Sequence, residues 1–120
     1  MTTTPTANFS VDSHFTGKDP VVRQIYECLL EKLATVGPVT VEPKKTSIHL
    51  NNVSALAGVA TRKNYLLLNI KSARKLDSPR IHKSEQLSAS RFHQEVKLTQ
   101  VVDVDEELMG WLRAAYSLSG

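Results

Sequence analysis

Residues 46–70, TSIHLNNVSALAGVATRKNYLLLNI, decide the fold. Near the start of this stretch His49 separates Ile48 from Leu50, and this alternation of apolar and polar residues has the period of a β-strand. The stretch predicts three strands, over residues 46–50, 56–60 and 65–70, joined by short turns. The last strand is apolar on both faces, so we expect it at the centre of a sheet.

Further strands are predicted on both sides of this stretch. Residues 39–41 indicate a short strand before it, and residues 91–98 indicate a longer one after it. Residues 72–90 have no regular period and are predicted to form a long surface loop or a loose hairpin. The sheet should therefore contain about five strands, which are mostly antiparallel because the connections between them are short.

A helix is predicted at each end of the strand region. Asp19 suits the N-cap of the first helix, and Pro20 suits its first turn. Apolar residues follow at helical spacing until the Gly-Pro pair at 37–38 ends the helix. The last helix is predicted to open at Asp103, because Glu106 three residues later completes a capping box.

Together these elements predict a single α+β domain in which the N-terminal and C-terminal helices flank one face of the sheet. A chain of 120 residues suits one domain. We assign residues 17–120 to this domain. Residues 1–16, which are rich in Thr, Asn and Ser, are predicted to form a mobile N-terminal tail.

Positive charge is concentrated in one part of the chain. Residues 44–91 hold ten of the fifteen Lys and Arg but only two of the twelve Asp and Glu, a local net charge of +8 in a chain of +3. These cations fall at predicted turns and strand ends, where they could gather on one rim of the sheet and bind phosphates of nucleic acid or another polyanion. The candidate residues are Lys44, Lys45, Arg62, Lys63, Arg74, Lys75, Arg80 and Lys83. The alternative is that they only keep the protein soluble.

A second candidate site lies on the outward face of the strands. Alternate residues of a strand share a face, so Arg91, His93 and Glu95 form a strip. His49 could join the strip from another strand, giving a site for a small anionic ligand or for acid–base chemistry. The alternatives are a solvated strand of alternating charges, and a homodimer formed through the exposed sheet face or a sheet edge.

The sequence favours a binding domain over an enzyme. Glu95 and Lys97 match the E-x-K element of metal-dependent nucleases, with Asp77 upstream, but the predicted order lacks the helix that precedes the last core strand of that fold. The four histidines have no paired ligand spacing, and there is no C-x-x-C. We therefore expect neither a metal site nor a cofactor.

A cytoplasmic location is the simplest interpretation of the composition. The longest purely apolar run, over 66–68, is far too short to cross a membrane. The first ten residues lack the basic start and apolar stretch of a secretory signal. The single cysteine, Cys28, cannot form an internal disulfide, which fits a reducing compartment.

Several short motifs, taken in order, resemble a known family. They are GKDP at 17–20, GPV at 37–39, KTSI at 45–48, RK at 62–63, DSPR at 77–80, and DVDEEL at 103–108 followed by WL at 111–112 and AY at 115–116. Over about residues 11–117 the chain is similar to domain of unknown function 5655. That family has no settled activity, so the resemblance implies no catalytic residue. Its domains sometimes accompany zinc-ribbon-like or nuclease-like modules, which implies nucleic-acid association by analogy.

Overall fold

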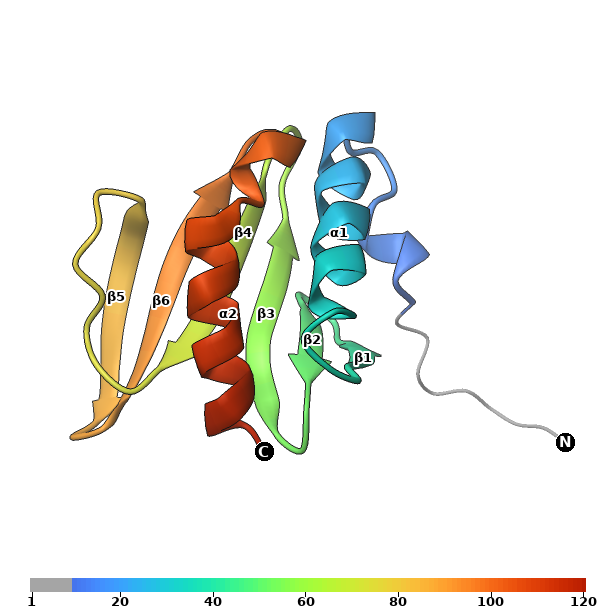
Figure 1. The fold of residues 1–120 in the computed structure, drawn as a ribbon. Helices are drawn as coiled ribbons and strands as arrows, with labels where there is room; N and C mark the ends of the chain where they lie inside the picture. Colours follow the sequence, from blue (N-terminus) through green and yellow to red (C-terminus); the bar gives the residue numbers. More distant parts are fainter. Residues whose placement is uncertain (1–9) are drawn as a thin grey trace, which may run out of the picture.

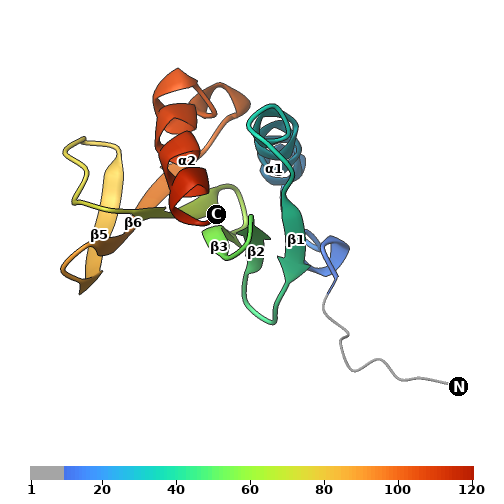
Figure 2. The ribbon, with the colours of Figure 1, turned by 60° about the horizontal axis from the view of Figure 1, so that its bottom comes forward.

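Two α-helices and a six-stranded sheet make up the computed structural model, which describes residues 10–120. Both helices lie on the same face of the sheet (Figures 1 and 2). In chain order the elements are the short 3₁₀ helix η1 (Asp12–His14), α1 (Pro20–Leu33), β1 (Thr40–Pro43), β2 (Ile48–Asn51), β3 (Ala55–Thr61), β4 (Leu66–Ser72), β5 (Ile81–Ser88), β6 (Arg91–Leu98), the 3₁₀ helix η2 (Val101–Asp103) and α2 (Glu106–Leu118).

The sheet is antiparallel throughout, with the strand order β1-β2-β3-β4-β6-β5. The first four strands follow one another as a meander. The chain then crosses to the outer edge, forms β5 and returns between β5 and β4 as β6. The predicted α+β class and antiparallel sheet are confirmed, and β4 lies in the interior of the sheet as expected.

The strand count is six rather than the five predicted, because β5 forms within the segment 72–90. This segment is therefore a loop over 73–80 followed by one arm of a β5–β6 hairpin. Most residues of β5 are exposed, since the strand lies at the sheet edge. An edge strand with little burial has no apolar period for sequence analysis to detect.

The covered face of the sheet supplies the core. Leu66, Leu68 and Ile70 of β4 are fully buried, and α2 packs on β4 and β3. Burial of a side chain of this size stabilises a fold by about 1.5–3 kcal/mol. Polar residues are also buried, namely Ser72, Gln94 and Ser119, and the amide of Gln94 donates to the Ser72 hydroxyl at 3.1 Å.

The first helix starts where predicted but ends earlier. Asp19 occupies the N-cap position without a side-chain capping bond, and its carboxylate pairs with Lys63 at 2.8 Å instead. The helix ends at Leu33, and turns lead to Gly37. A Cβ on Gly37 would collide with the ring and hydroxyl of Tyr116, so any other residue at this position would force the Tyr116 side chain to shift.

The second helix is capped by a residue other than the one predicted. Asp105 is its N-cap and accepts a hydrogen bond from the Leu108 N–H at 3.1 Å. Asp103 belongs to η2, where its carboxylate accepts from the Gln100 N–H at 3.1 Å in a capping box. Both acids are residue types that favour an N-cap, but only Asp103 has a glutamate three residues later, and this favoured the wrong one. Glu106 is the first residue of α2 rather than the third.

Part of the predicted tail belongs to the folded domain. Residues 12–14 form η1, and Phe15 is 8% exposed in the core with its ring centroid 5.1 Å from that of Tyr26. The Arg23 guanidinium lies 5.3 Å above the Phe15 ring. The domain thus includes residues before position 17, while positions 1–9 of the predicted tail lie outside the described residues.

Within residues 10–120, no helix combines the length and the apolar character needed to cross a membrane.

Candidate ligand site

The face of the sheet away from the helices carries a row of side chains that runs across the strands. The register aligns His49 of β2 with Gly58 of β3, then with Asn69 of β4 and Glu95 of β6. Neighbouring residues along each strand point to the opposite, covered face. Because adjacent strands lie about 4.8 Å apart, His49 and Asn69 stand roughly 10 Å from each other with only Gly58 between them.

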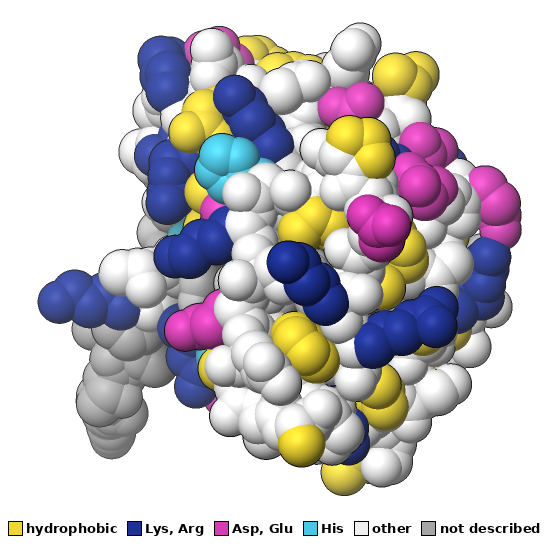
Figure 3. All heavy atoms as spheres, turned by 90° about the vertical axis from the view of Figure 1, so that its left-hand side faces the viewer, with side chains coloured by type: hydrophobic (Ala, Val, Ile, Leu, Met, Phe, Trp, Pro, Cys, Tyr) yellow, Lys and Arg dark blue, Asp and Glu magenta, His cyan; other side chains and the backbone are white. Residues whose placement is uncertain are grey.

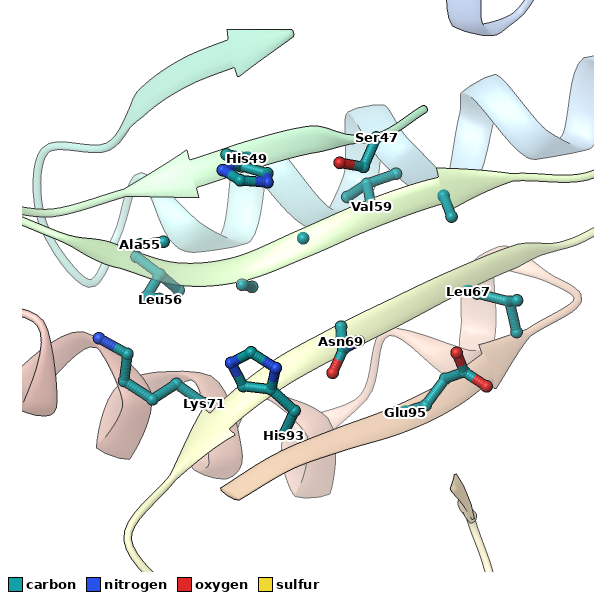
Figure 4. Close-up of a pocket in the computed structure, with 13 residues that line it drawn as sticks. Ser47, His49, Ala55, Leu56, Val59, Leu67, Asn69, Lys71, His93 and Glu95 are labelled. Carbon is teal, nitrogen blue, oxygen red and sulfur yellow. The ribbon is translucent and has the colours of Figure 1, made fainter. Parts of the chain in front are cut away.

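A hollow of about 210 Å³ lies along this row (Figure 4). Its floor is made of small or apolar residues, including Gly58 and Ala60 of β3 and Leu67 of β4. Polar side chains stand around it: Ser47 and His49 from β2 and the turn before it, and Asn69, Lys71, His93 and Glu95 from β4 and β6. An apolar floor with a few polar groups around it is the usual composition of a small-molecule site.

Gly58 creates much of this space. A Cβ added at Gly58 would meet no atom within 4 Å. Its backbone is not left-handed either, since Gly17 is the one residue with positive φ in the part of the chain that the structure describes. Neither crowding nor backbone conformation therefore requires glycine here. A glycine inside a strand weakens it, and one role of such a residue is to let a ligand approach closely.

The ionisable groups of the hollow are partly engaged with neighbours. Lys71 Nζ donates to the Ser54 hydroxyl at 3.2 Å. The Glu95 carboxylate is 22% exposed and lies 3.7 Å from His82 Nε2. A smaller hollow of about 40 Å³ continues toward β5, where Lys83 and Glu85 join the lining.

Most of these polar side chains present hydrogen-bond donors. The ammonium of Lys71 and the rings of His49 and His93 all present N–H donors, and the amide of Asn69 adds another. Lys71 and His93 are paired in the β4–β6 register and lie on the same face, so their side chains are neighbours at one end of the hollow. Glu95 is the one carboxylate in the lining, and it favours a donor group on the ligand near its own position.

Three of the four residues predicted as a ligand site line the hollow together, namely His49, His93 and Glu95. Arg91 does not, because it begins β6 beside the β5–β6 turn, where its Nη1 donates to the Ser90 carbonyl at 2.8 Å. Sequence reasoning missed Asn69, Lys71 and Gly58. The polar residues at 69 and 71 alternate with buried Leu68 and Ile70, which is the signal that could have placed them on the open face.

The cations predicted to bind a polyanion do not form a single rim. In an antiparallel sheet successive turns fall at alternate ends, so the β1–β2 and β3–β4 turns share one end while the chain leaves β4 at the other. The structure places Lys44, Lys45, Arg62 and Lys63 at one end of the sheet, Arg74 and Lys75 at the opposite end, and Lys83 within β5.

Two cations of the first group already have carboxylate partners. Lys44 Nζ lies 3.0 Å from Glu42, and Lys63 Nζ lies 2.8 Å from Asp19. The hydrogen bond from Lys44, followed by one from Asn51, lowers the pKa of Glu42. Such exposed pairs are weak and leave the cations accessible to a competing anion.

Arg80 holds the fold together on the helix side and is not free to bind an anion. Its Nη1 donates to Asp105 at 2.8 Å and to Glu107 at 3.1 Å, and its Nη2 donates to the Asp103 carbonyl at 2.7 Å. The guanidinium also lies 5.9 Å above the Trp111 ring. Burial lowers the pKa of Arg80, but the hydrogen bonds to the two carboxylates outweigh it and leave the pKa raised. Arg80 thus ties the loop before β5 to the start of α2.

Charged side chains are unevenly distributed around the molecule. Figure 3 views the β5 side, with the open face of the sheet to the left and the helices to the right. Lys and Arg side chains follow the left margin together with a histidine and also lie at the centre and right of this view, whereas most of the Asp and Glu side chains in view gather at the upper right. In this view the margin on the open face thus carries fewer carboxylates than the helix side does.

The sequence comparison agrees with the resemblance given by the motifs. The model of the domain of unknown function DUF5655 matches residues 11–119. The chain belongs to the DUF5655 family. No curated protein and no solved structure matches the chain.

The E-x-K element of this DUF5655 domain is split between two environments. Glu95 lines the hollow, whereas Lys97 Nζ lies 4.4 Å from the centre of the Tyr65 ring. Asp77, the carboxylate proposed to accompany them, lies in the loop before β5. Within residues 10–120, no three His, Cys, Asp or Glu side chains come together as a group that could hold a metal ion.

Proposed function

We propose that the open face of this DUF5655 domain binds a small molecule that carries a carboxylate or phosphate group. The observation that supports the proposal is the hollow above Gly58, with an apolar floor and a polar rim. The hollow lies on four strands of one sheet, so its walls are held by the backbone register rather than by a loop. A rigid, preformed site of this kind loses little entropy when it binds.

The size and chemistry of the hollow define the ligand. Its volume of about 210 Å³ is smaller than the range of roughly 300–1,000 Å³ typical of sites for drug-sized ligands. A compact molecule with one ring therefore fits better than an extended one. We expect its flat apolar part to lie on Gly58 and Ala60 and its anionic group to lie beside Lys71 and His93, away from His49.

A titration followed by nuclear magnetic resonance tests this proposal. Phenyl phosphate and benzoate serve as anionic probes, and benzyl alcohol is a neutral probe of similar shape. We expect the anionic probes to shift the backbone amides of Gly58 and Ala60, and we expect benzyl alcohol to bind at least tenfold more weakly because it lacks the charge that Lys71 recognises.

A matched pair of lysine variants separates the site from general surface charge. Lys71→Gln removes the ammonium at the hollow, and Lys75→Gln removes one from the loop outside its lining. We expect the first variant to weaken phenyl phosphate binding about tenfold and the second to leave it unchanged. Equal effects of the two variants, or amide shifts spread over the helix side, would contradict the proposal.

A second candidate function, binding of a nucleic acid or another polyanion, is favoured by the cations at the β1–β2 and β3–β4 turns. In the described part of the chain, Lys45 and Arg62 have no carboxylate partner, and Lys44 and Lys63 have exposed ones. We propose that a polyanion would contact this end of the sheet. Charge reversal at 44 and 45 should then weaken binding of a short duplex at low salt, and reversal at 74 and 75, at the opposite end, should not.

We also propose that the protein acts in a reducing compartment, with the cytoplasm as the simplest choice. Cys28 is a free, half-buried thiol on α1. A lone thiol is kept reduced in the cytoplasm, whereas it is at risk of intermolecular oxidation outside the cell. Fractionation of cells that express a tagged chain measures the location directly. Recovery of the chain in the secreted fraction would contradict a reducing compartment.

A further inference from the structure

The outer edge of the sheet at β5 is long and has no strand on its far side. Within residues 10–120, β5 pairs with β6 alone, and the strand order ends at β5. The opposite edge, β1, has four residues and ends in Pro43, whereas β5 has eight and contains no proline. A long edge strand presents backbone donors and acceptors that another strand can use.

The loop before β5 does not pair with this edge as a strand. It lies on the outer side of β5 in Figure 1, and Figure 2 shows that it is also displaced toward the helix side. In the described part of the chain, its one backbone hydrogen bond to β5 runs from the Ile81 N–H to the Ser78 carbonyl at 3.1 Å, at the very start of the strand. The residues that follow are mostly exposed, including Lys83 and Glu85.

The sequence of β5 is complementary to itself when read in the antiparallel direction. The strand reads IHKSEQLS over 81–88. If a second copy pairs with it about a two-fold axis through Ser84, Lys83 faces Glu85 of the other copy, and Glu85 faces its Lys83. Opposite charges thus meet at matching positions on both sides of the axis. Beyond this central segment the pairing of β5 with β6 shifts register, between Ile81 and Lys83 and between Gln86 and Ser88, so the regular part of the strand covers residues 83–86. Leu87, at the second shift, is 53% exposed in the single chain.

We propose that two copies of the chain associate through β5, antiparallel and centred on Ser84, to form one continuous sheet. The two-fold axis then stands perpendicular to the sheet, so the helices of both copies lie on the same side. Lys83 and Glu85 have no ion-pair partner within residues 10–120, so each is available to a second copy. Lys83 and Glu85 also line the smaller hollow of about 40 Å³ beside the ligand site, so the interface borders that site.

The charged pair also explains why such an edge need not aggregate. A lysine on an edge strand discourages pairing with arbitrary partners, because an unpaired ammonium is costly to bring against an apolar or cationic strand. A second copy in the antiparallel register is a partner that places a carboxylate opposite each ammonium. Opposite charges directly across a strand pair stabilise it, and like charges destabilise it.

Sedimentation equilibrium with a charge-swap series tests the interface. Lys83→Glu places two pairs of like charges across the axis, and Glu85→Lys does the same with the opposite sign. The double variant K83E/E85K restores opposite charges in every pair. We expect the wild type to dimerise, each single variant to raise the dissociation constant at least tenfold, and the double variant to return it to within about threefold of wild type.

The side chains of Lys83 and Glu85 are both exposed, so we expect every variant to keep the fold. A change in the dissociation constant then reports on the interface alone. Circular dichroism confirms that the fold is kept. A monomeric wild type at concentrations of several hundred micromolar would overturn the proposal. A dimer that neither single variant weakens, or that the double variant fails to restore, would place the interface elsewhere and would also overturn it.

Discussion

The two faces of this sheet are built from adjacent residues of the same strands and yet have opposite compositions. On the covered face, β4 presents Leu66, Leu68 and Ile70, all fully buried under the helices. On the open face, the same strand presents Leu67, Asn69 and Lys71, which line a hollow. The alternation of side chains along a strand thus separates the residues that stabilise the domain from those available for binding.

The charged side chains of the two faces differ in how strongly the fold constrains them, and this difference indicates which residues are available for binding. The charged groups on the covered side, such as Arg80 and Asp105, are bonded to one another and to the backbone. The charged groups on the open face are less constrained by the fold. We therefore expect substitutions on the covered side to change stability, and substitutions on the open face to change binding.

The largest effect should come from neighbouring leucines in β4. Leu68→Ala removes a fully buried side chain beneath the helices and should lower the free energy of unfolding by about 2–5 kcal/mol. Leu67→Ala, one residue earlier on the open face, should cost about 1 kcal/mol or less, because its side chain is only partly buried. Urea denaturation of both variants measures the difference, and equal losses would contradict the assignment of faces.

The second-largest loss of stability is expected from a carboxylate on the helix side, Asp105. Asp105→Ala removes the N-cap of α2 and a partner of Arg80, and it should lower the free energy of unfolding by about 1 kcal/mol. Glu106→Ala, which removes an exposed partner of Arg113, should cost about 0.5 kcal/mol or less.

The cost of losing Asp105 should depend on pH. The backbone hydrogen bond from Leu108, followed by the one from Arg80, lowers the pKa of Asp105 in the folded protein. A carboxyl with a lowered folded-state pKa stabilises the fold above its unfolded pKa of about 3.9, and this contribution disappears as pH falls through the folded value. Stability curves of wild type and Asp105→Ala should therefore converge below about pH 4. A constant difference down to pH 2 would show that the carboxylate charge is not involved.

Smaller changes in stability are expected on the open face. His49→Ala and His93→Ala should each alter the free energy of unfolding by about 0.5 kcal/mol or less, because their rings border the hollow rather than the core. The same variants should weaken binding of phenyl phosphate several-fold, the His93 variant more than the His49 variant. Thermal denaturation measures the stability of each variant, and calorimetric titration measures its affinity for phenyl phosphate. A variant that loses stability but keeps its affinity would contradict the assignment of the open face to binding.

Much of the fold could be predicted from the sequence because its local signals are strong. The strand over 91–98 was placed at its observed bounds, and the apolar positions of α1 are those that the structure buries. The missing strand, β5, has no apolar period because neither of its faces is deeply buried. The prediction for the cap of α2 is wrong because the capping-box spacing to Glu106 favours Asp103, whereas in the structure the Asp105 carboxylate accepts from the helix.

The candidate site was only partly predictable for a different reason. His49, His93 and Glu95 line the hollow together, and the sequence indicates this grouping because all three are outward residues of recognisable strands. The sequence could not show that Arg80 turns toward Asp105 and Glu107, since this contact spans more than twenty residues. It also could not show that Gly58 lies opposite His49 and Asn69, because that depends on the register of three strands.

The most direct test of the account is a paired measurement of stability and binding for Gly58→Val. The new side chain enters the hollow without meeting another atom at its Cβ, and it suits a strand better than glycine does. Gly110→Ala is the matched control, because Gly110 also has free space around its Cβ but lies on α2, away from the hollow.

We predict that Gly58→Val folds with unchanged stability or a gain of about 0.5–1 kcal/mol and loses binding of phenyl phosphate at least tenfold. We predict that Gly110→Ala gains a similar amount of stability and binds phenyl phosphate as the wild type does. A Gly58→Val variant that binds phenyl phosphate with wild-type affinity would contradict the central claim that the hollow on the open face is a ligand site.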